Sequence, residues 1–369
     1  MTCEILTMCD LGFLPQVLVL QASLERHGAD CHLRVLAVDS ESCEELEHRA
    51  GPGLSVVSVE ELEANDPEVG ALRSQRPRRE YCWTLTPAFC AGAVDTLEPG
   101  ATLMWVDADI AFYMHPRALA DELGEDSVLL VPHRYDRPYP TSALPNQLAE
   151  AYGYYNGGTL VLRGDEVGRA AAAHWRRRTI EWCDSRVEPG RYGNQRYLEE
   201  LVGQPGVRVA ASEEIGVAPW NVSSRTIGGT ADAPTADGRP LVFFHFQSLR
   251  LRRRWPGLPP AAHPANYVKP DPPSLRMVGR TSAWFRHRPA QRRVLWEPYL
   301  AALIDAADGL GPARAAYWNQ VPRVGMDEMR EDVAIRRALA LGRVADAWRS
   351  SSVKRQAGRL AATARRSAP

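Results

Sequence analysis

The sequence contains almost no lysine, no closely spaced cysteine pairs and no long apolar run. Of its 44 basic residues only Lys269 and Lys354 are lysine, a bias from which we draw no function. The seven cysteines include no Cys-x-x-Cys pair, so we expect reduced thiols in place of a zinc site or a disulfide framework. No apolar stretch approaches the roughly 20 residues that cross a bilayer, and the N-terminus lacks a basic region followed by an apolar one. These absences predict a cytoplasmic protein.

The composition is that of a globular protein with a large core. The chain has 369 residues, of which 45% are hydrophobic and 24% charged. Its net charge of -1 argues against nucleic acid as a partner of the whole chain. We expect a core domain over residues 1–257, then a Pro-rich linker and a basic helical extension over 258–369. From 334 onward nine basic residues stand against one acidic residue. This tail either lies on anionic lipid at the inner face of the membrane, packs on a subunit such as a second copy, or stays solvated.

Strand and helix patterns alternate along the first half of the chain. Apolar segments predict strands at 4–8, 33–38, 56–59 and 103–106. Apolar residues at helical spacing follow the first strand, and Ser40 with the acidic residues after it indicates the capped first turn of a helix after the second. We place the start of a further helix at Thr86-Pro87, because proline at the first helical position costs no hydrogen bond. The polar segment 65–79 is expected to form a loop over the site. The alternation predicts an α/β fold with a mostly parallel, Rossmann-like sheet and helices on both faces.

Two carboxylates follow the most apolar of these strands directly. Asp107 and Asp109 stand two residues apart where the strand ends, at the edge of the sheet where α/β proteins bind ligands. Their mutual repulsion is relieved by a shared hard cation such as Mg²⁺ or Mn²⁺, whose natural partner is a diphosphate. The alternative is a solvated turn, in which Asp is common. His245 ends a later strand, and it is either a structural histidine or the third ligand of that cation.

Two further segments place polar groups at the ends of elements. Gly157 and Gly158 open a strand, which suggests either that another group approaches the backbone closely or that the segment is an ordinary turn. Asn194 and Gln195 stand at the head of a helix that runs to Leu201. Each motif is weak alone, but their order along the chain is informative.

This order of motifs resembles that of metal-dependent glycosyltransferases of the GT-A fold. The similarity is to glycogenin-like and lipopolysaccharide galactosyltransferase-like (GT8-type) enzymes and spans roughly residues 3 to 250. The segments that carry it are Trp105-Val106-Asp107-Ala108-Asp109, Tyr155-Asn156-Gly157-Gly158, Gly193-Asn194-Gln195-Arg196-Tyr197-Leu198, Ala218-Pro219-Trp220-Asn221 and Phe244-His245-Phe246.

The resemblance implies a GT-A catalytic domain with a helical C-terminal appendage. Its activity would be the transfer of a hexose from a nucleotide diphosphate, UDP first, to a hydroxyl of a glycan or small molecule, as in cell-envelope or natural-product biosynthesis. Retention of configuration is favoured over inversion. The resemblance implies Mn²⁺ or Mg²⁺ on Asp107, Asp109 and His245, with Asp109, Asn194 and Gln195 as the catalytic residues. The substrate-binding residues that it implies are Thr7, Met8, Cys9, Asp10, Gly12, Asp39, Arg79, Asp107, Asn156, Gly157, Gly158, Trp220 and Asn221.

Departures from the family pattern keep other readings open. The family usually has Asp where Asn194 stands, so a non-catalytic nucleotide-sugar-binding protein is an alternative. A phosphohydrolase of the haloacid dehalogenase type also carries Asp-x-Asp after a strand. That family places the motif near the N-terminus and has Thr or Val at the position of Ala111. A dehydrogenase would need G-x-G-x-x-G after the first strand, and this sequence has none there.

Overall fold

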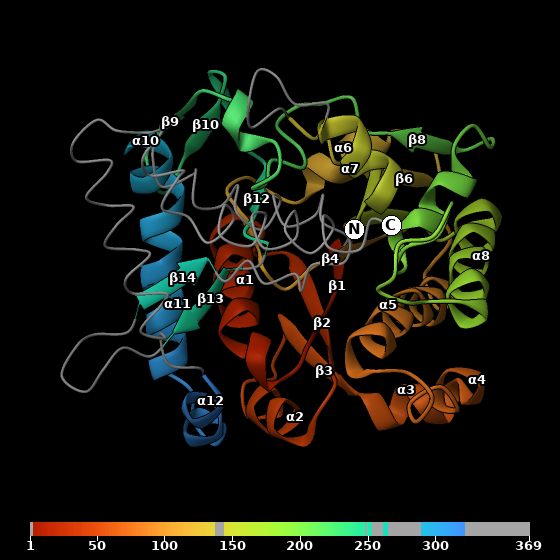
Figure 1. Cartoon of the computed structure of the whole chain (residues 1–369). Helices are drawn as coiled ribbons and strands as arrows, with labels where there is room; N and C mark the ends of the chain where they lie inside the picture. The colour runs from red at the N-terminus through yellow and green to blue at the C-terminus, as the bar shows by residue number, and fades with distance from the viewer. Residues whose placement is uncertain (1–2, 137–143, 248, 253–260, 265–288, 322–369) are drawn as a thin grey trace, which may run out of the picture.

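The computed structural model describes residues 3–136, 144–247, 249–252, 261–264 and 289–321. At its centre is a seven-stranded sheet of order β3-β2-β1-β4-β7-β6-β8 (Figure 1). Only β7 runs against its neighbours, β4 and β6, so the sheet is mostly parallel, and the expected α/β class is confirmed. The strands are β1 Cys3–Cys9, β2 Cys31–Ala37, β3 Leu54–Ser58, β4 Thr102–Val106, β6 Val128–Pro132, β7 Tyr155–Arg163 and β8 Val207–Val209.

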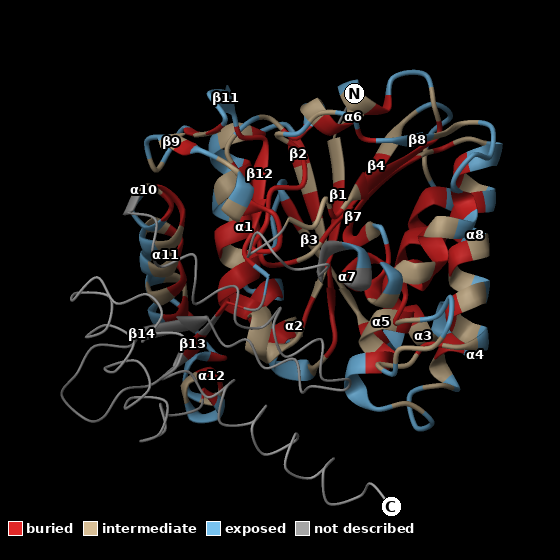
Figure 2. Cartoon of the chain, turned by 45° about the horizontal axis from the view of Figure 1, so that its top comes forward, coloured by how far each residue is buried: buried red, intermediate tan, exposed pale blue. Residues whose placement is uncertain are grey.

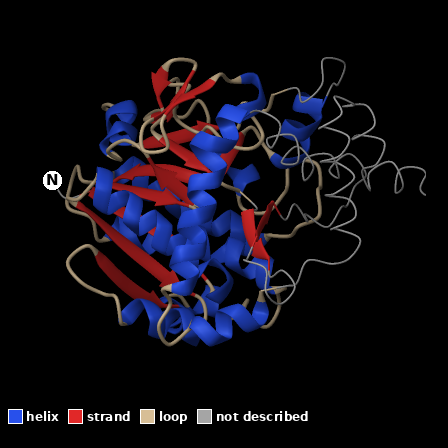
Figure 3. Ribbon diagram, turned by 90° about the vertical axis from the view of Figure 1, so that its left-hand side faces the viewer, coloured by secondary structure: helices blue, strands red, loops and turns tan. Residues whose placement is uncertain are grey.

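Helices cover both faces of this sheet (Figures 2 and 3). Successive residues of β4 point to opposite faces, so Met104 and Val106 pack in the core around α1, whereas Leu103 and Trp105 pack in the core around α5. The α-helices are α1 Leu14–His27, α2 Ser40–Glu47, α3 Val59–Asn65, α4 Pro67–Gly70, α5 Arg78–Asp95, α6 Arg117–Leu123, α7 Leu144–Tyr152, α8 Glu166–Glu181, α10 Pro289–Gln291, α11 Glu297–Asp308 and α12 Arg314–Gln320. Short 3-10 helices are η1 Leu11–Phe13, η2 Gln195–Leu201 and η3 Val222–Ser224, and η5 Arg292–Trp296 is a π-helix.

Small antiparallel ladders lie beside the main sheet. Their strands are β5 Ile110–Phe112, β9 Ile227–Gly229, β10 Pro234–Ala236, β11 Arg239–Pro240, β12 Phe243–His245, β13 Leu249–Arg252 and β14 Ala261–Pro264. The pair that matters for the site is β12 with β5, in which His245 is the partner of Ile110. Because β5 follows the two carboxylates of the β4 end, this pairing brings a residue 136 positions further along the chain to their side.

The start of α5 differs from the expectation. The helix begins at Arg78 and carries Pro87 in its interior, whereas the sequence pattern placed the start at Thr86-Pro87. The polar segment before it is likewise no continuous loop, since it holds α4 and the first residues of α5. The local sequence does not distinguish a proline at the start of a helix from one inside it. Here the packing of α5 against α8 and the sheet determines that the helix begins before Pro87.

The cap of α2 also lies one residue earlier than expected. Asp39 is its N-cap, and its side chain accepts hydrogen bonds from the backbone N–H groups of Ser42 and Leu11. Ser58 caps α3 in the same way, so Val59 belongs to that helix and not to the preceding strand. Asp39 therefore fixes the ends of two elements at once: the start of α2 and the turn after β1.

The C-terminal helices share a core with the sheet domain. Tyr299 of α11 stacks on Phe246 with ring centroids 3.6 Å apart, and Leu303 is fully buried. Buried Glu45 of α2 accepts hydrogen bonds from the N–H groups of Gly311 and Ala313. The proposed boundary at residue 257 stays a prediction. The basic tail and most of the Pro-rich linker lie outside the described residues. Within the described parts of the chain, no helix combines the length and the apolar character that crossing a membrane requires.

Candidate metal and nucleotide-sugar site

Three chain segments meet at the carboxyl end of β4. Asp107 N–H donates to Gly158 O at 2.9 Å, which ties the end of β4 to the beginning of β7. Phe246 N–H donates to Asp109 O at 2.7 Å, which ties the same turn to the end of β12. Because β7 runs antiparallel to β4, its first residues lie at the carboxyl edge, where only the last residues of a parallel strand would otherwise stand.

Asp107, Asp109 and His245 converge at this junction. Their ligand atoms all lie within 4.8 Å of one another. His245 Nε2 is 3.0 Å from Asp109 Oδ1 and 3.6 Å from Asp107 Oδ2. Asp109 and His245 are buried, whereas the side chain of Asp107 is 42% exposed to the cavity above. The side chains that the sequence predicted as a metal site are therefore brought together.

The charges of these groups are strongly coupled. Burial raises the pKa of Asp107 to about 6, with His245 opposing the rise and Asp109 adding to it. Burial alone would lower the pKa of His245, but the carboxylates of Asp109 and Asp107 outweigh it and raise that pKa. When His245 is protonated, its charge offsets those of the two carboxylates.

Two observations test whether a divalent cation fits here. His245 Nε2 is buried and faces both carboxylates, at 3.0 Å from Asp109 Oδ1 and 3.6 Å from Asp107 Oδ2, so one nitrogen and two oxygens surround a common point. A Cβ on Gly158 would lie 2.4 Å from Asp107 Oδ2 and 2.9 Å from His245 Cε1, so only glycine permits this close approach. Two carboxylates and an imidazole are a donor set that suits Mn²⁺ or Mg²⁺. The group fits a cation, and the expected close approach at the two glycines is confirmed.

A second cluster of metal-ligand types shows the contrast. Asp30, Cys31 and His115 also gather, at the end of β2 opposite the cavity. There the Nδ1 of His115 accepts the backbone N–H of Arg117, so Nε2 carries the proton and donates to Asp30 at 2.6 Å. Asp30 is exposed, and none of the three residues lines the cavity described below, so this cluster lacks the buried setting of the first.

The metal-ligand group lies at the floor of a cavity of about 550 Å³. Of the predicted site residues, the cavity is lined by Met8, Cys9, Asp10, Arg79, Asp107, Asp109, Asn156, Gly157, Gly158, Asn194, Gln195, Trp220 and His245. Four predicted residues lie outside its lining, namely Thr7, Gly12, Asp39 and Asn221. Thr7 is fully buried in β1, and the Asn221 amide holds the carbonyl groups of His133 and Gly216.

A paired set of charges stands at one end of the cavity, and we call it the Arg78 pair group: Asp10, Asp39 and Arg78. Asp10 and Arg78 line the cavity, and Asp39 lies outside its lining. Arg78 lies 2.8 Å from Asp39 and 3.5 Å from Asp10. Asp10 also accepts the N–H of Gly12, and Asp39 caps α2. Each charge here has a partner in the protein.

Amide side chains line the cavity near the glycines. Gln195 Nε2 donates to the carbonyl of Tyr152 at 2.6 Å, and Gly157 N–H points at its Oε1 at 3.4 Å. Asn194 Nδ2 donates to the carbonyl of Trp83 at 3.1 Å. Asn156 bridges Gly158 N–H and the Nδ1 of His245, at 2.9 and 3.3 Å. Asn194 and Gln195 thus both donate from their nitrogens to backbone carbonyls, and the Oε1 of Gln195 accepts the N–H of Gly157.

Aromatic rings form another part of the lining, the aromatic wall, and the family motifs include Trp220 but not Trp83, Tyr152 or Tyr192. Tyr192 contacts Trp83 and Tyr152, at ring distances of 5.6 and 4.6 Å. His133 stacks on Tyr135 and meets Trp220, which in turn meets His245 edge-on. Burial lowers the pKa of His133 to about 3, so this imidazole is neutral.

A sequence signal existed for part of this wall. Arg79, Trp83 and Thr86 recur at helical spacing along one face of α5 and all line the cavity. Placing the helix start at Thr86 hid this pattern. Tyr152 and Tyr192 belong to separate segments, and no periodicity connects them.

Comparison with known proteins assigns the chain to a family. No family model matches the chain. The protein named "Uncharacterized protein YfnD" of Bacillus subtilis (strain 168) is 31% identical over 232 residues, which cover 62% of this chain and 72% of that protein. The chain belongs to the YfnD family. A second B. subtilis protein, named "Uncharacterized protein YfnF", is 26% identical over 253 residues, which cover 68% of this chain and 83% of the relative.

Solved structures with some likeness to this YfnD-family chain are distant. Mouse xyloside xylosyltransferase 1 has a TM-score of 0.41 at 12% identity, covering 66% of this chain and 97% of that one. GlyE of Streptococcus pneumoniae TIGR4, a glycosyltransferase, has 0.39 at 13% identity, covering 78% and 64%. The bifunctional glycosyltransferase WbbM has 0.36 at 12% identity, covering 56% and 38%. Structural similarity at this level does not indicate an activity. The activity is therefore inferred from the site.

Proposed function

We propose that this YfnD-family chain is a GT-A glycosyltransferase of GT8-like type that moves a hexose from a nucleotide diphosphate, UDP first, to a hydroxyl. The observation that carries the proposal is the convergence of Asp107, Asp109 and His245 at the floor of the cavity, pressed against Gly158. A nucleotide-sugar donor needs a divalent cation beside its diphosphate and short polar groups beside its sugar. Within about 550 Å³ the cavity offers a set of side chains that could bind the cation and amide groups that could contact the sugar.

The three ligand residues would hold Mn²⁺ or Mg²⁺. The bound cation supplies neutralisation of the negative charge that develops on the diphosphate as the glycosidic bond breaks. His245 is positioned by the edge of the Trp220 ring and by Asn156 at its Nδ1, and Asp109 is fixed through its backbone by Phe246. The protein keeps these groups in place before the donor arrives, which lowers the cost of reorganisation.

The remaining cavity divides by chemistry. Met8, Cys9, Phe13 and Val38 give an apolar wall near Asp10 that suits a nucleobase and ribose. The oxygens of Asn194 and Gln195 suit sugar hydroxyls, which donate hydrogen bonds. We propose retention, with Gln195 as the polar group beside the anomeric carbon, because an oxocarbenium-like transition state needs no strong base there.

The aromatic wall would receive the acceptor. Trp83, Tyr152 and Tyr192 present ring faces and edges on the side of the cavity next to the amide oxygens. Such surfaces stack on sugar rings and on planar small molecules. The acceptor is therefore proposed to be a glycan or a small molecule whose hydroxyl reaches the sugar from this side.

Calorimetry of UDP binding tests the metal centre. With Mn²⁺ present, UDP should bind at least about tenfold more tightly than without it, and Asp109→Ala should remove this difference. Asp30→Ala is the matched control, because it removes a carboxylate from the separate cluster of Asp30, Cys31 and His115. The metal centre is rejected if UDP affinity is the same with and without Mn²⁺ in the unaltered chain.

Turnover separates the proposed enzyme from its alternatives. A thermal-shift panel of nucleotide sugars with Mn²⁺ selects the donor, and NMR of the product gives the anomeric configuration. A donor that binds but yields neither transfer nor hydrolysis across acceptors would favour a non-catalytic nucleotide-sugar-binding protein. Release of inorganic phosphate from phosphate esters without sugar transfer would favour the phosphohydrolase. An inverted product would keep the class and discard the role of Gln195.

A further inference from the structure

Pro87 leaves a backbone carbonyl of α5 without its helical partner. In an α-helix the N–H of residue 87 would donate to the carbonyl of Trp83, four residues earlier, but proline has no N–H. An unpaired carbonyl at a buried helix face costs free energy, and another donor normally takes the place of the missing one.

The donor that takes this place comes from Asn194. Its Nδ2 lies 3.1 Å from Trp83 O. The backbone carbonyl of the same residue accepts the indole N–H of Trp175 on α8 at 2.7 Å, so Asn194 is held from two helices at once. With nine-tenths of its surface buried, this residue has little freedom to adopt another arrangement.

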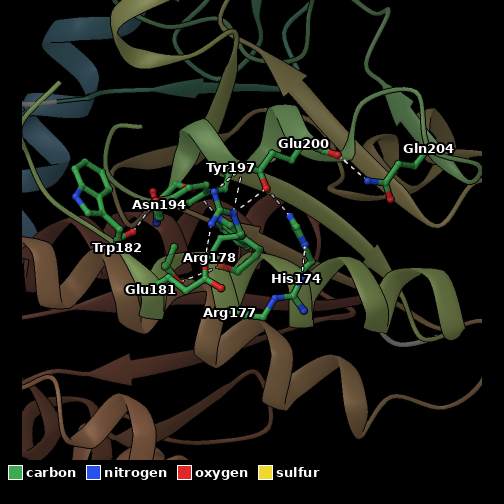
Figure 4. A network of polar contacts seen from close by, with 11 residues as sticks. His174, Arg177, Arg178, Glu181, Trp182, Asn194, Tyr197, Glu200 and Gln204 are labelled. Carbon is green, nitrogen blue, oxygen red and sulfur yellow. Dashed lines mark hydrogen bonds and ion pairs between the residues drawn. The ribbon is translucent and has the colours of Figure 1, made fainter. Parts of the chain in front are cut away.

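A polar network on α8 holds the rest of this segment (Figure 4). Arg178 reaches Glu200 of η2 at 3.0 Å and lies over the ring of Tyr197, 4.7 Å from its centroid. The Tyr197 hydroxyl donates to Trp182 O at 2.8 Å. Contacts along its length therefore hold η2 against α8, and Asn194, directly before η2, joins it to α5.

This fixed orientation decides what Asn194 can offer. Its nitrogen is committed to Trp83, and its Oδ1 is turned toward Gly157, where a Cβ would lie only 3.2 Å from it. Gln195 follows directly and also meets Gly157. A shift of the Asn194 side chain would therefore displace both amide oxygens at the sugar end of the cavity.

We propose that Asn194 is a positioning residue coupled to Pro87: its amide replaces the hydrogen bond that Pro87 removes from α5 and thereby sets the orientation of Asn194 and Gln195 toward the donor sugar. The coupling stands on the fold alone, whereas its effect on the sugar rests on the proposed function. An aspartate at this position, though of the same shape, would place a carboxylate oxygen against Trp83 O and leave both without a donor.

A double-mutant cycle tests the coupling. Asn194→Asp should lower the Tm by about 3–6 °C, because a buried acceptor loses its donor. In Pro87→Ala the new N–H of residue 87 can satisfy Trp83 O, so Asn194→Asp should cost less than half as much in that background. Asn65→Asp, on an exposed helix end, is the charge control and should change the Tm little in either background.

The result that overturns the coupling is an equal loss of Tm in both backgrounds. Should Asn194→Asp alone fail to fold, recovery of a folded protein in the double variant supports the coupling, and failure of the double variant while Pro87→Ala folds rejects it.

Kinetics with UDP-glucose and Mn²⁺ add a readout that a purely structural role would not move. Asn194→Asp should leave UDP affinity unchanged, lower the rate of UDP release from UDP-glucose by roughly 10–100-fold, and regain most of that rate in the double variant. Loss of rate without recovery would reject the positioning role. If the unaltered chain releases UDP from no nucleotide sugar, the proposed function fails, and the Tm cycle still decides the coupling.

Discussion

The two charged ends of the cavity solve the same electrostatic problem in different ways. In the Arg78 pair group, Asp10 and Asp39 meet a guanidinium and backbone N–H groups, so the protein supplies every partner itself. At the metal-ligand group, Asp107 and Asp109 share one imidazole, that of His245, and the side chain of Asp107 is 42% exposed to the cavity. The difference teaches that carboxylates paired with a guanidinium inside the protein do not by themselves indicate a ligand, whereas two carboxylates that share one imidazole at the floor of a cavity do.

The largest effect is expected at Gly158. Adding a methyl group 2.4 Å from Asp107 Oδ2 forces the carboxylate or the strand to move, so Gly158→Ala should weaken Mn²⁺ binding by roughly 10–100-fold. Gly92→Ala is the matched control, because a Cβ there meets nothing within 4 Å, and at this exposed position of α5 it should stabilise by about 0.5–1 kcal/mol. Mn²⁺ titration calorimetry measures both, and unchanged affinity in Gly158→Ala would remove the close approach from the account of the site.

A second contrast is the pH dependence of the metal end. Cation binding requires deprotonated ligands, and the pKa of Asp107 is raised to about 6 while that of His245 is raised as well. Groups with raised pKa values hold protons as pH falls toward 6, so Mn²⁺ affinity should be on the order of tenfold lower at pH 5.5 than at pH 7.5. Calorimetry in two buffers of different ionisation enthalpy should show proton release on binding. A flat affinity profile over this range would contradict the predicted raised pKa values.

The third effect is expected in the Arg78 pair group, where a variant tests whether this group is independent of the metal-ligand group. Asp39→Ala removes the cap of α2 and the partner of Arg78, so it should destabilise the chain by about 1–2 kcal/mol without changing Mn²⁺ affinity. Ser58→Ala removes a cap of α3 and serves as the control. Urea unfolding should show a loss in both variants. Reduced Mn²⁺ affinity in Asp39→Ala would mean that the two ends are not separate.

The smallest effect is expected for Arg78→Gln. Its side chain is 55% exposed, and an ion pair of this kind contributes less than about 1 kcal/mol. Its stability should therefore stay close to that of the unaltered chain, with a UDP affinity that becomes less sensitive to salt. A loss of several kcal/mol in urea unfolding would show that Arg78 does more than pair with these two half-buried carboxylates.

Local patterns predicted the parts of the fold that local forces determine. The strand over Thr102–Val106 and the helix over Leu14–His27, capped by Gly28, follow from apolar runs and helical spacing. Pro87 shows the limit of this approach. Its missing N–H is tolerated inside α5 because Asn194, 107 residues later, supplies the donor, and no local pattern contains that information.

The site divides along the same line. The sequence alone determined which residue types the site uses, since Asp-x-Asp after an apolar strand and a strand-end histidine carry their chemistry in their side chains. Only the tertiary structure decided their arrangement: β7 runs antiparallel and brings Gly158 to Asp107, and β12 pairs with β5 and brings His245 to Asp109. It also decided that the Asn221 amide binds the carbonyl of His133 instead of lining the cavity, and that the rings of Tyr192 and Trp83 pack together in the cavity lining. The physical reason is that the packing of the whole core determines which residues are buried and which distant backbone groups pair. The chemistry of a side chain, in contrast, follows from the residue type alone.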